Sequence, residues 1–80
     1  MIINMQLPIK IGDTICFLKA TDENKYATIT EIHIIVFGSK ENNVKIKLFW
    51  QQYEEENNKK ILCDEGSTYL DYLGKDFCVV

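Results

Sequence analysis

The stretch Lys25–Phe37, KYATITEIHIIVF, decides the fold because its alternation changes phase halfway. Apolar residues fall on odd positions up to Ile29 and on even positions from Ile32 onward. Successive side chains of a strand point to opposite faces, so all of these residues can share one core only if an extra residue shifts the alternation. We therefore predict one long strand with a β-bulge near Thr30-Glu31, bent so that two sheets share it.

The next segment, Val44–Tyr53, alternates cleanly between apolar and polar or aromatic positions. Paired antiparallel across the turn-rich residues Gly38–Asn43, the two segments form one continuous apolar face. In this register Val36 lies opposite Ile46, Ile34 opposite Leu48 and Ile32 opposite Trp50. A slip of one residue would turn every side chain to the other face, so the pattern specifies which side is buried.

Turn-rich clusters at Glu54–Asn58 and Asp64–Ser67, among others, separate further short pieces with strand composition. Residues 69–74 are too few for a stable helix and suit one turn of 3₁₀ helix before the last strand. Four strands, a helical turn and a last strand predict an all-β, five-stranded, SH3-like small barrel. We expect a single domain over residues 1–80, with residues 1–8 as an N-terminal extension. The remaining predicted strands are Thr14–Lys19, Lys59–Cys63 and Asp76–Val80.

Three short motifs carry a family resemblance: IGDTICF at Ile11–Phe17, ATITEI at Ala27–Ile32 and YLGKDF at Tyr72–Phe77. They resemble the GDTVYF, GTVTEI and LGKTVF motifs of small SH3-like barrel proteins from low-GC bacterial and phage genomes. The resemblance touches most of the chain, and its motifs are a turn, a bent strand and the turn into the last strand. It implies the barrel fold and no established activity.

Composition narrows the class of partner. The formal charge is −3, every basic residue is lysine, and the sequence pI is about 5.0. This leaves no basic footprint and no arginine for bidentate phosphate or guanine contacts, so nucleic acid is not the expected partner. No apolar run approaches the roughly 20 residues that span a bilayer, and no targeting signal is recognisable, so we expect a cytoplasmic protein. Lys-, Asn- and Ile-rich usage is typical of AT-rich coding, as in low-GC bacteria and their phages.

We expect no metal, cofactor or catalytic site. The single histidine has no nucleophile tied to it by a known motif, and Glu54–Glu56 is typical of a solvated loop. A Cys₃His zinc site has the right elements but no pair at the spacing that lets one turn present two ligands. The three cysteines are therefore interpreted as free structural thiols. The four residues weighed for zinc are Cys16, His33, Cys63 and Cys78.

The candidate site is the outward face of the central hairpin. The predicted register places His33, Ile35 and Phe37 there, opposite Phe49, Lys47 and Lys45 respectively. Large apolar residues rimmed by lysines, where a half-buried sheet should be polar, usually mark a contact surface. An equally weighted alternative is that Ile2–Met5 folds back and covers this patch. Four tyrosines form a weaker set, interpreted as core and rim packing: Tyr26, Tyr53, Tyr69 and Tyr72.

Three functions follow from this sequence. The first is a non-enzymatic protein-binding module, of which a phage-encoded inhibitor of a host protein is one form. The second is a self-assembling structural protein that pairs through the same patch or through the edge strand Asp76–Val80. The third is a nucleic-acid or nucleotide-binding barrel that uses Phe49 with Lys45 and Lys47.

Overall fold

The computed structural model describes residues 7–20, 25–36 and 44–80, and shows an all-β protein built on one antiparallel sheet. The five strands lie in the order β4-β3-β2-β1-β5, and one 3₁₀ turn, η2, precedes the last strand. The all-β class, the five strands and the 3₁₀ turn are confirmed. Within the described ranges no pairing joins β4 to β5, so the sheet is not closed. The elements are β1 Thr14–Phe17, β2 Tyr26–Val36, β3 Val44–Glu56, β4 Lys59–Tyr69, η2 Leu70–Tyr72 and β5 Phe77–Val79.

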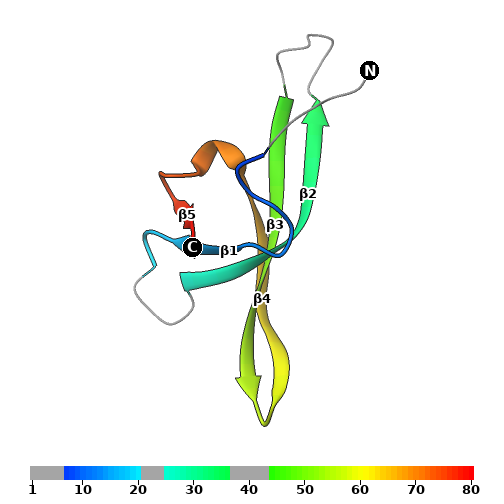
Figure 1. Ribbon diagram of the computed structural model, residues 1–80, viewed down its shortest axis with the longest axis vertical. Helices are drawn as coiled ribbons and strands as arrows, with labels where there is room; N and C mark the ends of the chain where they lie inside the picture. The colour runs from blue at the N-terminus through cyan, green and yellow to red at the C-terminus, as the bar shows by residue number, and fades with distance from the viewer. Residues whose placement is uncertain (1–6, 21–24, 37–43) are drawn as a thin grey trace.

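The predicted irregularity of β2 is confirmed. Its register against β3 shifts between Ile29 and Glu31, so Thr30 is the extra residue. The first part of β2 runs beside β1, and the strand then bends to run along β3 (Figure 1). The bend lets both halves of β2 turn their apolar residues toward one core, which is what the phase change required.

The β2–β3 register differs by two residues from the predicted one. Ile32 lies opposite Leu48, Ile34 opposite Ile46 and Val36 opposite Val44. A shift of two keeps every side chain on its predicted face, because strands repeat every two residues. The apolar alternation therefore determines the face and leaves the choice between these two registers open.

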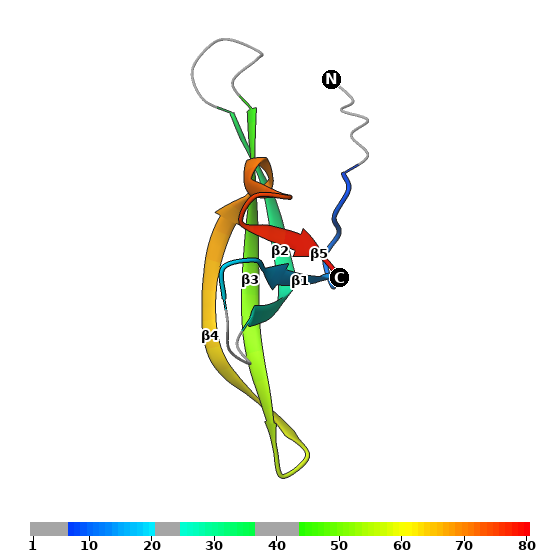
Figure 2. The ribbon, with the colours of Figure 1, turned by 90° about the vertical axis from the view of Figure 1, so that its left-hand side faces the viewer.

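The β3–β4 hairpin is longer than predicted. The turn is only two residues, Asn57 and Asn58, with φ values of 53° and 63°. This is the left-handed conformation that asparagine tolerates and that a type I′ hairpin turn requires. The predicted loop at Glu54–Asn58 is therefore mostly strand, and the two arms project beyond the rest of the sheet (Figures 1 and 2).

The predicted turn at Asp64–Ser67 is wrong, because β4 continues through it to Tyr69. Gln52 lies opposite Asp64 and Tyr53 lies opposite Leu62, which makes Cys63 the extra residue of a second bulge. The strand is strongly curved in Figure 2.

The core forms where β1 and β5 cross the middle of the long strands (Figures 1 and 2). Its fully buried side chains come from all strands except β4, and Ile9 precedes β1. Burial ends toward the far end of the β2–β3 pair, where Val36 is 60% exposed. The buried apolar residues are Ile9, Ile15, Ala27, Ile29, Ile46, Leu48 and Phe77.

Candidate protein-binding face

The predicted site residues that the structure describes lie on one face of β2 and β3. We call it the outer face: the side of β2, β3 and β4 turned away from the buried Ile46 and Leu48. The cross-strand pairs His33–Lys47 and Ile35–Lys45 lie on this face, and Phe49 lies beside them opposite Glu31. Phe37 falls outside the described residues.

Phe49 is the centre of the outer face, and its ring is half-buried by its neighbours. The His33 ring centroid lies 4.6 Å from that of Phe49, and Lys47 Nζ lies 5.2 Å from the Phe49 centroid. The imidazole Nε2 of His33 is also 2.9 Å from a Glu31 carboxylate oxygen. The surface is therefore a mixture of aromatic and charged groups. It exposes less apolar area than the apolar stripe that the sequence predicts, because Ile35 and Phe49 are both half-buried.

β4 and η2 extend the outer face with groups that no sequence motif indicates. Tyr69 lies opposite Lys47, and its ring lies 6.5 Å from that of Tyr72. Lys45 Nζ lies 2.5 Å from Asp71 Oδ2 and 5.9 Å from the Tyr69 centroid. The sequence favours packing roles for the tyrosines, and only the β3–β4 register brings Tyr69 beside the lysines.

The Lys45–Asp71 ion pair predicts a pH response. The hydrogen bond from Lys45 holds the pKa of Asp71 below its ordinary value, and the same bond raises the pKa of Lys45. The stabilisation from Asp71 is therefore present above the unfolded pKa of about 3.9 and is lost as the pH falls through the lower folded pKa. Its size is small because both side chains are exposed.

We expect Lys45→Met to raise the pKa of Asp71 toward its ordinary value, measured by NMR titration of the carboxyl carbon. Lys75 also lowers the pKa of Asp71, as the weakest of the causes. Lys75→Met should therefore move the pKa less and serves as the matched control. An unchanged Asp71 pKa in Lys45→Met would show that the ion pair does not persist in solution.

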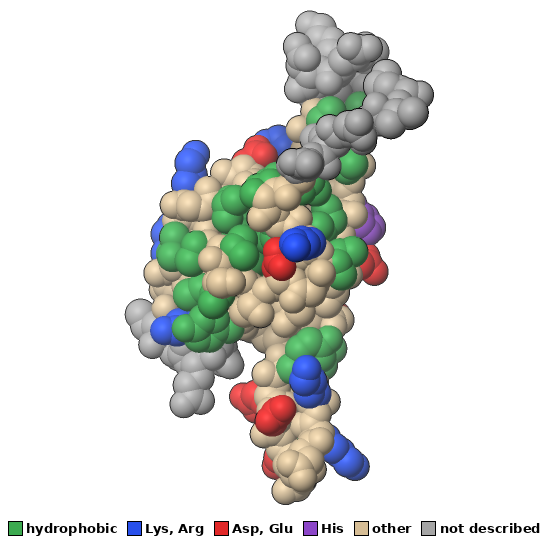
Figure 3. Space-filling view, viewed as in Figure 1, with side chains coloured by type: hydrophobic (Ala, Val, Ile, Leu, Met, Phe, Trp, Pro, Cys, Tyr) green, Lys and Arg blue, Asp and Glu red, His purple; other side chains and the backbone are tan. Residues whose placement is uncertain are grey.

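Apolar side chains also lie outside this face. Figure 3 shows apolar groups over the middle of the molecule and, separately, on the β3–β4 hairpin above its charged tip. Exposed aliphatic residues at the far end of the β2–β3 pair face the opposite side: Val36 is 60% exposed, Ile34 is 47% exposed and Val44 is 39% exposed. They share a face with the core and lie beyond its end, which makes them matched comparison positions for the outer face.

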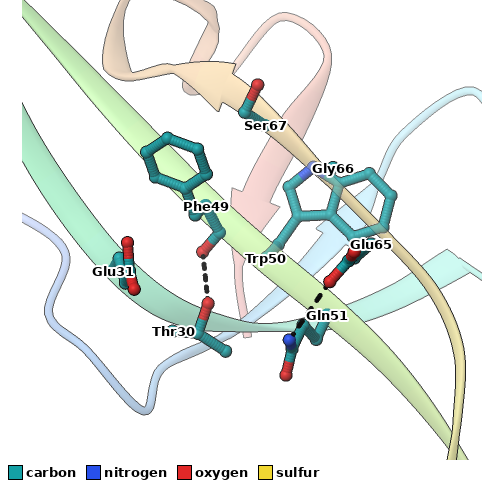
Figure 4. A pocket seen from close by; sticks show the side chains of 8 residues that line it. All are labelled: Thr30, Glu31, Phe49, Trp50, Gln51, Glu65, Gly66 and Ser67. Carbon is teal, nitrogen blue, oxygen red and sulfur yellow. Dashed lines mark hydrogen bonds between the residues drawn. The ribbon is translucent and has the colours of Figure 1, made fainter.

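A hollow of about 340 Å³ lies on the outer face beside the β2 bulge (Figure 4). Thr30 Oγ1 donates a hydrogen bond of 3.4 Å to the Phe49 carbonyl at its rim. Gln51 Nε2 donates to Glu65 Oε2 at 3.3 Å, and the Tyr53 hydroxyl donates to the Gln51 side-chain oxygen. The hollow is lined by Thr30, Glu31, Phe49, Trp50, Gln51, Glu65, Gly66 and Ser67.

The structure does not bring the four residues weighed for zinc together at one place. Cys16 and Cys78 are cross-strand partners on β1 and β5, whereas His33 lies beside Phe49 and Cys63 is in the β4 bulge. Among residues 7–20, 25–36 and 44–80, no group of three or more His, Cys, Asp or Glu side chains could hold a metal ion. In the same ranges, no helix has the length and apolarity needed to cross a bilayer.

The local geometry of the outer face is thus defined by three strands and η2. Comparisons of the chain with protein-family models, with curated proteins and with solved structures found no match.

Proposed function

We propose that this protein is a non-enzymatic protein-binding module that contacts its partner through the outer face. The observation that carries the proposal is the convergence of Phe49, Ile35 and Tyr69 with two lysines on one face of three paired strands. Aromatic side chains are enriched at protein interfaces, where a rigid ring adds contact area at a low cost in conformational entropy.

The hollow supports the same proposal. It places a recess beside the Phe49 ring, with carboxylates of Glu31 and Glu65 at its edges. A partner side chain with an apolar stem and a polar or cationic end would fit this combination, because the stem packs on the ring while the charge meets the carboxylates. The opposite end of the face carries Lys45 and Lys47 and would suit acidic groups.

We infer further that the fold is of the SH3-like barrel type. The support is the bent β2, paired with β1 through its first part and with β3 through the rest, together with a 3₁₀ turn directly before a short last strand. In this arrangement the outer face belongs to the three-stranded half, so a partner would dock on the side turned away from the core.

The proposal predicts that Ile35→Ser and Phe49→Ser weaken partner binding at least tenfold, because each removes apolar contact area at the centre of the face. The measurement is a pulldown with the tagged protein from a low-GC bacterial lysate, with and without nuclease, followed by affinity measurements on the captured protein. Val36→Ser is the matched control, because Val36 is the next residue of the same strand and points to the opposite face.

Three outcomes are decisive. Loss of binding in Ile35→Ser and Phe49→Ser, with Val36→Ser unchanged and all three proteins folded by circular dichroism, supports the outer face. Equal affinity in all variants would place the contact elsewhere. Capture that disappears with nuclease would replace the protein partner with a nucleic acid bound through Phe49, Lys45 and Lys47.

A further inference from the structure

The strand β4 is an edge of the sheet. In the part of the chain that the structure describes it pairs only with β3, and most of its eleven residues are exposed. A strand of this kind presents a row of unpaired N–H and C=O groups that can pair with another strand. Pairing along this edge uses backbone groups of β4 and not the cluster around Phe49, so the inference goes beyond the proposed function, although Glu65 also lines the hollow.

The charges along this edge would complement those of a second copy of the same strand aligned antiparallel to it. Residues 59–65 read KKILCDE: two lysines, three apolar residues and two carboxylates. Laid antiparallel against a copy of itself, the basic end of each strand meets the acidic end of the other. Like-charge pairs, which disfavour edge pairing, are absent from this alignment.

We propose that β4 pairs antiparallel with β4 of a second copy of this chain, about a twofold axis at Leu62. Leu62 then lies opposite its counterpart, and Lys60 lies opposite Glu65 on both sides of the axis. Ile61 lies opposite the Cys63-Asp64 bulge. A twofold axis makes both halves of the contact identical and closes the assembly at two copies.

The bulge in β4 brings the side chains that would pair in this register to the same face of the sheet. Lys60 and Leu62 share a face with their β3 partners Glu55 and Tyr53. Glu65, three residues after Leu62, would point to the other face of a regular strand. Because Cys63 is an extra residue, Glu65 returns to the face of Leu62 and can meet Lys60 of the other copy.

The backbone directions agree with the same register. The residues that flank a two-residue hairpin turn, here Glu56 and Lys59, exchange hydrogen bonds, and the direction of the backbone groups then alternates along the strand. The backbone N–H and C=O groups of Lys60 and Leu62 are therefore directed away from β3, toward the free edge. The extra residue in the bulge shifts this alternation by one position, as it does for the side chains. The backbone N–H and C=O groups of Glu65 are therefore directed to the free edge as well.

The exposed apolar residues at the centre of the edge favour pairing, because a second copy would bury part of their surface. Ile61 is 45% exposed and Leu62 is 47% exposed, and Tyr53 beside them is 43% exposed. These side chains belong to the hairpin on which Figure 3 shows an apolar patch above the charged tip. Pairing would cover part of this apolar area and extend the sheet across both copies.

The test is a charge exchange between copies, followed by sedimentation equilibrium over a range of concentrations at low salt. We expect wild type to dimerise, and we expect K60E and E65K each to weaken the dimer at least tenfold through repulsion. An equal mixture of K60E and E65K should restore the dimer, because both cross-strand pairs are then of opposite charge. K75E changes the net charge as K60E does, and should dimerise like wild type.

The mixture shows whether a variant is monomeric because of charge repulsion or because it has misfolded. A misfolded variant could not form the heterodimer. A heterodimer in the mixture, with each variant monomeric alone, establishes the proposed pairing. Monomeric wild type at millimolar concentration, a mixture that stays monomeric, or a dimer that neither substitution affects would each overturn it. Partner binding through Phe49 is measured separately, so failure here is distinguishable from failure of the proposed function.

Discussion

Replacing Phe77 with alanine is expected to lower the free energy of unfolding by about 3–5 kcal/mol, which for a domain of this size is much of the total. The side chain is 0% exposed, lies at the centre of the core and pairs across strands with Phe17. Its removal leaves a cavity and loosens β5, whose three residues pair with β1 and are otherwise joined only by a bridge from Phe77 to Leu73 in the described ranges. Urea unfolding followed by Trp50 fluorescence measures the change.

Val80→Ala is the matched control for Phe77→Ala. Val80 lies three residues further along and is 73% exposed, so its truncation should change the stability by less than about 0.5 kcal/mol. A loss below about 1 kcal/mol for Phe77→Ala would mean that β5 does not complete the core in solution.

The second large effect is expected at Gly66. This glycine lies opposite Trp50, and a Cβ added to it would lie 2.5 Å from Cζ2 of the Trp50 ring. The ring cannot move freely, because it also packs edge-on against Phe17 at a centroid distance of 5.1 Å. We expect Gly66→Ala to cost about 1–3 kcal/mol through overpacking, and Gly66→Val to cost more.

A double-mutant cycle isolates the cause at Gly66. Trp50→Leu destabilises the protein through lost packing, but adding Gly66→Ala to it should then cost much less than in the wild type. Ser67→Ala tests the neighbouring exposed position and should be nearly neutral. If the cost of Gly66→Ala were the same with and without Trp50, the ring would not be the obstacle.

Gly66 also explains why β4 continues through a segment that is predicted to be a turn. Asp64–Ser67 has the composition of a turn, and glycine is the residue that most often signals one. Here its missing side chain makes room for a ring on the neighbouring strand, a tertiary requirement that no local pattern shows. The bulge near Thr30 was predictable for the opposite reason, because it displaces the apolar alternation along the chain itself.

The outer face was predictable only in part. Alternation alone places His33, Ile35, Lys45, Lys47 and Phe49 together, and a register error of two residues does not disturb that result. The contacts that define the surface depend on the third strand and on η2, whose positions relative to β3 follow from the long hairpin and its bulge. The pairing of Lys45 with Asp71 therefore required the structure.

The position of β5 has a consequence for folding during synthesis. The β3–β4 hairpin closes through a two-residue turn, so its contacts are local and are expected to form early. The contact between β1 and β5 joins Ile15 to Val79, so it forms only after all the other strands have been synthesised. A nascent chain that stops short of Phe77 exposes the surface that this residue covers, so the core cannot be completed while those residues are still inside the ribosome.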